Sequence, residues 1–130
     1  MSDESPTILL IEEDLTLLEI TGFRLELLGY RVEAMNSAEQ ALEWLRDRLP
    51  TLIIVEQVLT GIDGIEFINR LSNDMRTSDV PIMFLSTTSD LEEVRRAYNA
   101  GADEYLVIPY DPLVLESKVE RLTSATLLNK

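Results

Sequence analysis

The sequence contains no cysteine and no histidine. The absence of cysteine excludes disulfide bridges and thiolate chemistry, and the absence of histidine removes the most common general base, metal ligand and phosphohistidine carrier. No apolar run approaches the roughly 18 residues that a membrane-spanning helix needs. The acidic start Met1–Pro6 lacks the basic residues and the apolar stretch of a signal peptide. We therefore expect a soluble, cytoplasmic protein whose chemistry depends on carboxylates and hydroxyl groups.

Basic residues are few, because 11 lysines and arginines face 24 aspartates and glutamates, which gives a formal net charge of −13. Long-range repulsion by this charge opposes direct binding to nucleic acid or to an anionic membrane. Solubility alone would explain the charge equally well. We expect a protein partner, with no direct nucleic-acid contact and no membrane insertion.

Short apolar runs alternate with helical stretches along the 130 residues. The runs 8–11, 52–55 and 82–85 predict strands buried on both faces, and the run 105–107 predicts a further strand. The alternating segment Arg31–Ala34 predicts an edge strand. Helix N-cap signals lie at Asp14, Ser37, Ser89 and Asp111. Strands that alternate with helices predict an α/β fold with a doubly wound parallel sheet covered on both faces. We expect an N-terminal tail at 1–6, one domain at 7–122, and the end of the last helix or a linker at 123–130.

Carboxylates follow two of the predicted strands directly. Glu12, Glu13 and Asp14 come after the run 8–11, and Glu56 comes after the run 52–55. The carboxyl ends of parallel strands meet at one edge of a sheet, where α/β proteins place their sites. Several carboxylates at this edge predict an oxygen-lined pocket suited to a divalent cation or a phosphoryl group.

Five motifs follow one another in the order Ile8–Asp14, Pro50–Glu56, Thr60–Gly64, Pro81–Ser86 and Ala100–Pro109. Over nearly the whole chain they resemble the receiver domain of bacterial two-component response regulators. The resemblance implies a three-layer (βα)5 flavodoxin-like sheet with strand order 2-1-3-4-5. It also implies that the bond between Ile108 and Pro109 is cis, although the trans form is the more common for an X–Pro bond considered alone.

The sequence differs from the family pattern at the positions that carry the family's chemistry. The phosphoacceptor aspartate corresponds to Glu56, the lysine before the proline corresponds to Ile108, and the acid pair corresponds to Glu12 and Glu13. One added methylene displaces the carboxylate, and a displacement of about 1 Å can cost about 100-fold in rate. We therefore expect a pseudo-receiver, in which Glu56 either imitates aspartyl phosphate in part or has simply lost the function.

Ser86 corresponds to the hydroxyl residue of the family, and Tyr105 corresponds to the aromatic residue whose inward or outward rotamer reports phosphorylation. A serine at a strand end and a tyrosine with one wet edge are also ordinary structural features. Without a fixed cation, Glu12, Glu13 and Glu56 should hold one proton tightly, recruit a metal ion or separate into water. No cofactor is required, and Mg²⁺ bound by these three residues stays an alternative.

The first helical stretch is more apolar than one core-facing stripe requires, and a contiguous patch that includes Phe23 and Leu27 would indicate a partner or dimer contact. Charges of both signs occur in the last two helical stretches, where they suit a homodimer face or a solvated surface: Glu92, Glu93, Arg95, Arg96, Lys118, Glu120 and Arg121.

We expect a signalling module without enzymatic activity that acts by contact with a signalling protein or a histidine kinase output component. Two alternatives stay open. One is a metal-dependent phosphoacceptor that uses Glu56. The other is a small Mg²⁺-dependent phosphohydrolase that uses Glu12, Glu13 and Glu56.

Overall fold

The computed structural model describes residues 5–128, and this part of the chain alternates five strands with five helices. The strands are β1 (Thr7–Ile11), β2 (Arg31–Met35), β3 (Leu52–Glu56), β4 (Ile82–Ser86) and β5 (Glu104–Val107). The helices are α1 (Leu15–Leu27), α2 (Ala38–Trp44), α3 (Gly64–Ser72), α4 (Leu91–Ala100) and α5 (Pro112–Leu128). All strand pairs are parallel and the order is β2-β1-β3-β4-β5, which confirms the predicted topology. Residues 1–4 of the expected tail and residues 129–130 lie outside the described residues.

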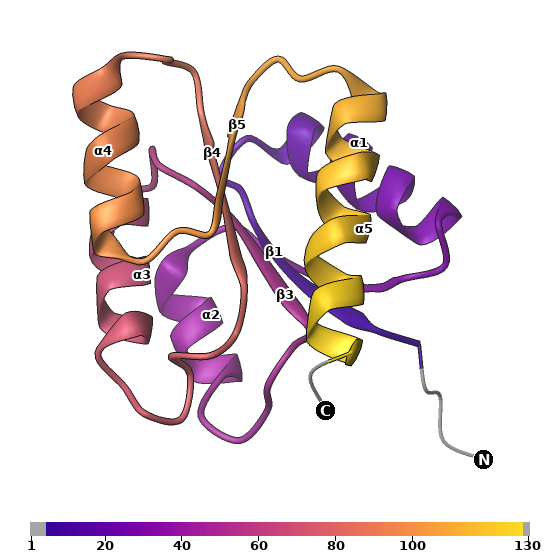
Figure 1. The fold of residues 1–130 in the computed structure, drawn as a ribbon, viewed down its shortest axis with the longest axis horizontal. Helices are drawn as coiled ribbons and strands as arrows, with labels where there is room; N and C mark the ends of the chain where they lie inside the picture. Colours follow the sequence, from indigo (N-terminus) through magenta and orange to yellow (C-terminus); the bar gives the residue numbers. More distant parts are fainter. Residues whose placement is uncertain (1–4, 129–130) are drawn as a thin grey trace.

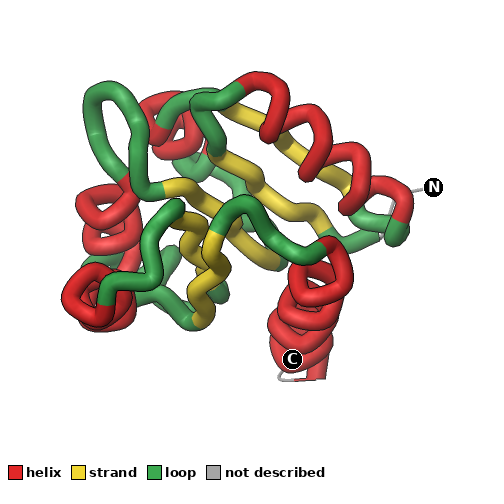
Figure 2. Tube along the Cα trace, turned by 90° about the horizontal axis from the view of Figure 1, so that it is seen from above, coloured by secondary structure: helices red, strands yellow, loops and turns green. Residues whose placement is uncertain are grey.

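The sheet lies between two layers of helices (Figure 1), with α1 and α5 on one face and α2, α3 and α4 on the other. Figure 2 shows the strands between these layers from above. Successive residues of a strand point to opposite faces, so each strand contributes to both layers. Leu9 and Ile11 pack toward α2 and α3, whereas Ile8 and Leu10 pack in the core beneath α1 and α5.

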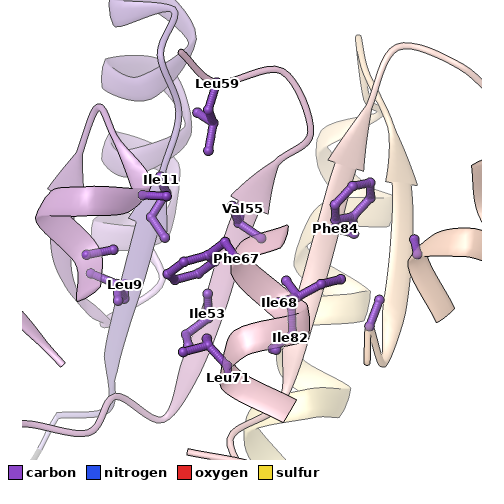
Figure 3. Close-up of a cluster of buried hydrophobic side chains, with 14 of the residues drawn as sticks. Leu9, Ile11, Ile53, Val55, Leu59, Phe67, Ile68, Leu71, Ile82 and Phe84 are labelled. Atoms are coloured by element: carbon purple, nitrogen blue, oxygen red, sulfur yellow. The ribbon is translucent and has the colours of Figure 1, made fainter. Parts of the chain in front are cut away.

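The larger core is centred on α3 (Figure 3). Phe67 is fully buried and lies among side chains of β1 and β3, including Ile11, Ile53 and Val55. Burial of a phenylalanine side chain contributes about 1.5–3 kcal/mol to folding. This packing holds α3, and the loop that precedes it, against the carboxyl end of β3.

Most helices begin where the sequence predicted. Asp14 accepts from the backbone N–H groups of the first turn of α1, and Ser37 accepts from the first turn of α2. The predicted cap at Ser89 is wrong, because Asp90 accepts from the Glu92 N–H at 2.9 Å and α4 begins one residue later. A carboxylate is the stronger acceptor at the positive end of a helix.

Apolar side chains are exposed along one stripe of α1. Ile20, Phe23 and Leu27 are 47%, 62% and 70% exposed, and their spacing places them on one side of the helix. The apolar excess predicted for this helix is thus present at the surface, while its use as a contact stays a prediction. None of the helices in residues 5–128 combines the length and the hydropathy needed to cross a membrane.

Three cations assigned to the mixed-charge surface have partners within the chain. Glu104 at the start of β5 is 9% exposed, and it accepts from the ammonium of Lys118 at 2.5 Å and pairs with Arg121. Arg95 pairs with Glu92 one turn away on α4. The pairs with Glu104 join β5 to α5, a role that the sequence did not indicate.

Candidate functional site

The register of the sheet places Glu12 beside Glu56. Ile11 pairs with Val55. The residues that follow them, Glu12 and Glu56, therefore also lie side by side, at the strand spacing of about 4.8 Å. Both side chains fall on the side of the sheet that faces α1 and α5, because the alternation continues from Leu10 and from Ile54. Both are buried, with exposed fractions of 1% for Glu12 and 7% for Glu56.

Glu13 has the opposite orientation. Its Oε2 accepts from the backbone N–H of Thr60 at 2.9 Å, which ties the segment after β1 to the loop after β3. This interaction with Thr60 lowers the pKa of Glu13 below its usual value. The sequence grouped Glu13 with Glu12 and Glu56, and the structure separates it from their facing pair.

The carboxyl group of Glu12 holds a proton at neutral pH. Burial is the first cause that raises its pKa to about 8, and the neighbouring Glu56 carboxyl is the second. Its Oε2 accepts from the N–H of Asp14 at 3.1 Å, and a side-chain hydrogen bond joins the carboxyl groups of Glu12 and Glu56. Two carboxyls that face each other without a cation favour one neutral member. A tightly held proton was one of the three outcomes that the sequence left open.

An open cavity of about 420 Å³ lies at this edge of the sheet. It is lined by Glu12, Glu13, Asp14, Leu17, Glu56, Val58, Thr87 and Ile108. No lysine or arginine is among these lining residues, and Ile108 is 6% exposed because it packs into the core beneath α1 and α5. The cavity therefore combines carboxylates with aliphatic walls.

The carboxylates do not fit a metal site of three protein ligands. Within residues 5–128 no three acidic side chains are grouped closely enough to hold a metal ion. The reason is the orientation of Glu13, whose carboxylate is occupied by Thr60. The predicted set of Glu12, Glu13 and Glu56 around Mg²⁺ is therefore not assembled in this arrangement.

Ser86 and Tyr105 lie together near the same edge, outside the lining of the cavity. The Tyr105 hydroxyl donates to the carbonyl of Thr88 at 2.8 Å, and the Thr88 N–H donates to Ser86 Oγ at 3.3 Å. The Tyr105 ring is 9% exposed and packs against Phe84 with centroids 5.7 Å apart. Burial raises the pKa of Tyr105, and the interaction with Ser86 opposes this effect. The bond between Ile108 and Pro109 is cis, as the resemblance implied.

Comparison with known proteins identifies the family. The model of the response regulator receiver domain matches residues 8–120. The chain belongs to this family. It is 35% identical over 114 residues to the transcriptional regulatory protein AfsQ1 of Streptomyces coelicolor, and the aligned region covers 88% of this chain and 49% of that protein. It is 30% identical over 120 residues to the phosphate regulon transcriptional regulatory protein PhoB of Pseudomonas aeruginosa, and the aligned region covers 92% of this chain and 52% of that protein.

This receiver domain thus spans about half the length of the curated relatives named above. Among solved structures, it is similar to the signal receiver domain of a signal transduction histidine kinase from Syntrophus aciditrophicus, with a TM-score of 0.87 and 30% identity over 93% of this chain and 92% of that chain. A CheY-like receiver domain protein from Methanospirillum hungatei has a TM-score of 0.90 at 23% identity, covers 98% of this chain and 100% of that chain, and supports the fold alone.

Several residues of the receiver site were missed in the sequence. Thr87, Leu17 and Val58 line the cavity. Positions just after a strand could have indicated Thr87 and Val58, whereas Leu17 lies in the first turn of α1 and had no such signal. Asp63 caps α3 by accepting from the Glu66 N–H at 2.9 Å. An aspartate three residues before a glutamate is a capping signal, and the sequence contains it at these two positions.

Proposed function

We propose that this receiver domain acts by protein–protein contact in two-component signalling and does not accept a phosphoryl group at Glu56. One observation carries the proposal: Glu12 and Glu56 face each other at the site edge, and the aliphatic Ile108 lines the same cavity without any cation. In the family resemblance, Glu56 and Ile108 stand where an aspartate and a lysine perform the chemistry.

Phosphoryl transfer to a carboxylate requires an ionised nucleophile and positive charge on the phosphoryl oxygens. Glu12, whose pKa is raised to about 8 by burial and by Glu56, supplies no positive charge, and no lysine or arginine lines the cavity. The longer glutamate side chain also displaces the attacking oxygens, and about 1 Å of displacement can cost about 100-fold. These effects act together against phosphorylation, and we expect no catalytic turnover either.

The contacts of Ser86 and Tyr105 support a retained switch. Tyr105 is held inward by its bond to the Thr88 carbonyl, and the same loop residue donates to Ser86. We propose that Glu56 biases this loop through its fixed position at the end of β3, in place of a reversible phosphoryl group.

A protein is the partner that the charge favours. With a net charge of −13, direct contact with nucleic acid would be repulsive, although the curated relatives named above are transcriptional regulatory proteins. We propose that a signalling protein, a histidine kinase output component or a second copy of the chain contacts this domain. The exposed stripe of Ile20, Phe23 and Leu27 on α1 offers apolar area for such a contact.

The test is treatment with acetyl phosphate and Mg²⁺, followed by intact mass measurement and assay of released phosphate. We expect neither an adduct nor turnover. A stable adduct mapped to Glu56 would contradict the proposal and establish the phosphoacceptor alternative. Phosphate release without an adduct would instead establish the phosphohydrolase alternative.

A double variant, Glu56→Asp with Ile108→Lys, provides the matched positive control. It restores the shorter carboxylate and the missing cation together, and we expect it to gain a phosphoryl group while each single variant gains little, because the two groups act as a unit. A folded double variant that binds Mg²⁺ but gains no phosphate would show that the backbone of the site has also changed.

A further inference from the structure

We propose that residues 60–62, in the loop between β3 and α3, form a strap that two carboxylates hold closed and that opens as one unit. The carboxylates are those of Glu13, in the segment after β1, and Glu39, in the first turn of α2. Glu13 also lines the cavity, so opening of the strap releases an acid at the cavity mouth. The inference goes beyond the proposed function, because it holds whether or not Glu56 accepts a phosphoryl group.

Both ends of the strap are anchored in the fold. Leu59 is buried in the core on the α3 side of the sheet (Figure 3). Asp63 caps α3, since its side chain accepts from the Glu66 N–H at 2.9 Å and its carbonyl accepts from the Phe67 N–H at 2.9 Å. A movement that leaves the core and α3 intact is therefore confined to the three residues between these anchors.

Two hydrogen bonds fix the backbone of the strap. The Thr60 N–H donates to Oε2 of Glu13 at 2.9 Å. The Ile62 N–H donates to Oε2 of Glu39 at 2.9 Å, and this bond is the main reason why the pKa of Glu39 lies below its usual value. Among the described residues, the backbone N–H groups of the strap have no other acceptor. Both bonds have an ionised acceptor at neutral pH, which makes them stronger than bonds between neutral groups.

Gly61 couples the two hydrogen bonds. It lies between the two donors with φ of 84°, in the left-handed region that favours glycine. Peptide planes are rigid and both ends of the strap are fixed, so a rotation at Gly61 must be compensated at Thr60 and Ile62. Loss of either bond therefore turns both N–H groups away from their acceptors.

The strap opens far more easily than the domain unfolds. Glu13 and Glu39 are exposed, so water replaces either carboxylate as an acceptor at low cost. A contact on α2 that draws Glu39 away from Ile62 also frees the Glu13 carboxylate beside the cavity. The strap thus gives a partner on α2 a means to change the charge at the cavity mouth.

The test is amide hydrogen exchange in nitrogen-15 NMR spectra of the whole chain near neutral pH. Glu39→Gln weakens one bond directly, and we expect exchange to accelerate about tenfold at both Ile62 and Thr60. Glu13→Gln should produce the same pair of changes from the other end. Glu43→Gln makes an equal charge change at another exposed position of α2 and should leave both amides within about twofold of wild type.

Gly61→Ala tests the strap without altering either carboxylate. An added Cβ would collide with the Glu39 carboxylate, and the positive φ disfavours alanine, so both amides should again exchange about tenfold faster. Acceleration at Ile62 alone in Glu39→Gln would overturn the inference, because the two bonds would then open independently. Equal acceleration in Glu43→Gln, or unchanged exchange in both Glu39→Gln and Gly61→Ala, would also overturn it. The mass measurement described above is independent, so failure of the strap and failure of the proposed function are distinguishable.

Discussion

The proton on Glu12 makes the stability of this receiver domain depend on pH in an unusual direction. Its pKa rises from 4.5 to about 8 on folding, chiefly through burial and then through Glu56. A raised pKa means that the folded state binds the proton more tightly than the unfolded state. The stabilisation is fully present below about pH 4.5 and is lost as the pH rises through about 8. Glu12→Gln keeps the shape of the side chain and removes the titration.

The magnitude follows from the size of the shift. From about pH 4.5 to above pH 8, the loss of folding stability from this group has an upper bound of about 5 kcal/mol. The share of that loss that falls between about pH 7 and pH 9 is about 1.4 kcal/mol. Water entering from the open cavity reduces this second part to about 1 kcal/mol. Glu12→Gln should therefore be more stable than wild type by about 1–3 kcal/mol at about pH 7, and the margin should grow by about 1 kcal/mol at about pH 9.

The assay is urea unfolding of both proteins at about pH 5, 7 and 9 in buffer with a metal chelator. Glu13→Gln serves as the control, because the Glu13 carboxylate is exposed, accepts from Thr60 and has a lowered pKa. This control should lose stability at neutral pH, whereas Glu12→Gln gains it. A margin for Glu12→Gln that stays constant from about pH 5 to 9 would refute the reasoning.

Three further predictions concern the frame of the site. Gly64→Ala places a Cβ 2.6 Å from the last carbonyl oxygen of β3 and should lower the free energy of unfolding by about 2–3 kcal/mol, measured by thermal unfolding. Gly29→Ala is the control, because a Cβ there has free space although φ is 101°, and it should cost about 1 kcal/mol. Equal losses for the two variants would contradict this prediction. Tyr105→Phe should cost about 1 kcal/mol and remove a phenol that ionises above the usual tyrosine range in ultraviolet titration; an unchanged titration would contradict it. Glu104→Gln should cost about 1–2 kcal/mol, with a smaller loss in high salt; a loss independent of salt would show that packing matters more than charge.

Much of the fold could be predicted because the strands of this sheet are apolar on both faces. The runs 8–11, 52–55 and 82–85 each match a strand to within one residue at either end. The missed ends are informative: Glu56 and Ser86 are polar, so an apolar run excludes them, but their backbones still pair with the neighbouring strands. Strand order is not contained in any run of residues, and it came from the family resemblance.

The site could be predicted only in part. Parallel strands bring Glu12, Glu13 and Glu56 to one edge, and that argument ignores the pleat, which turns adjacent residues to opposite faces. The register of Ile11 with Val55 was also needed to place Glu12 beside Glu56. Contacts between distant loops, such as the Thr60 N–H with Glu13, depend on the packed structure and have no local signal.

The direction of the chain has a practical consequence for surface attachment. β1 begins at Thr7 on the edge of the sheet opposite to the cavity, and α5 runs back from the end of β5 to finish at Leu128 near that same edge (Figure 1). A linker joined near Thr7 or Leu128 therefore leaves the cavity facing solution. Sensor chips, resins or fluorescent labels coupled at these positions can present the acidic cavity to soluble partners without covering its mouth.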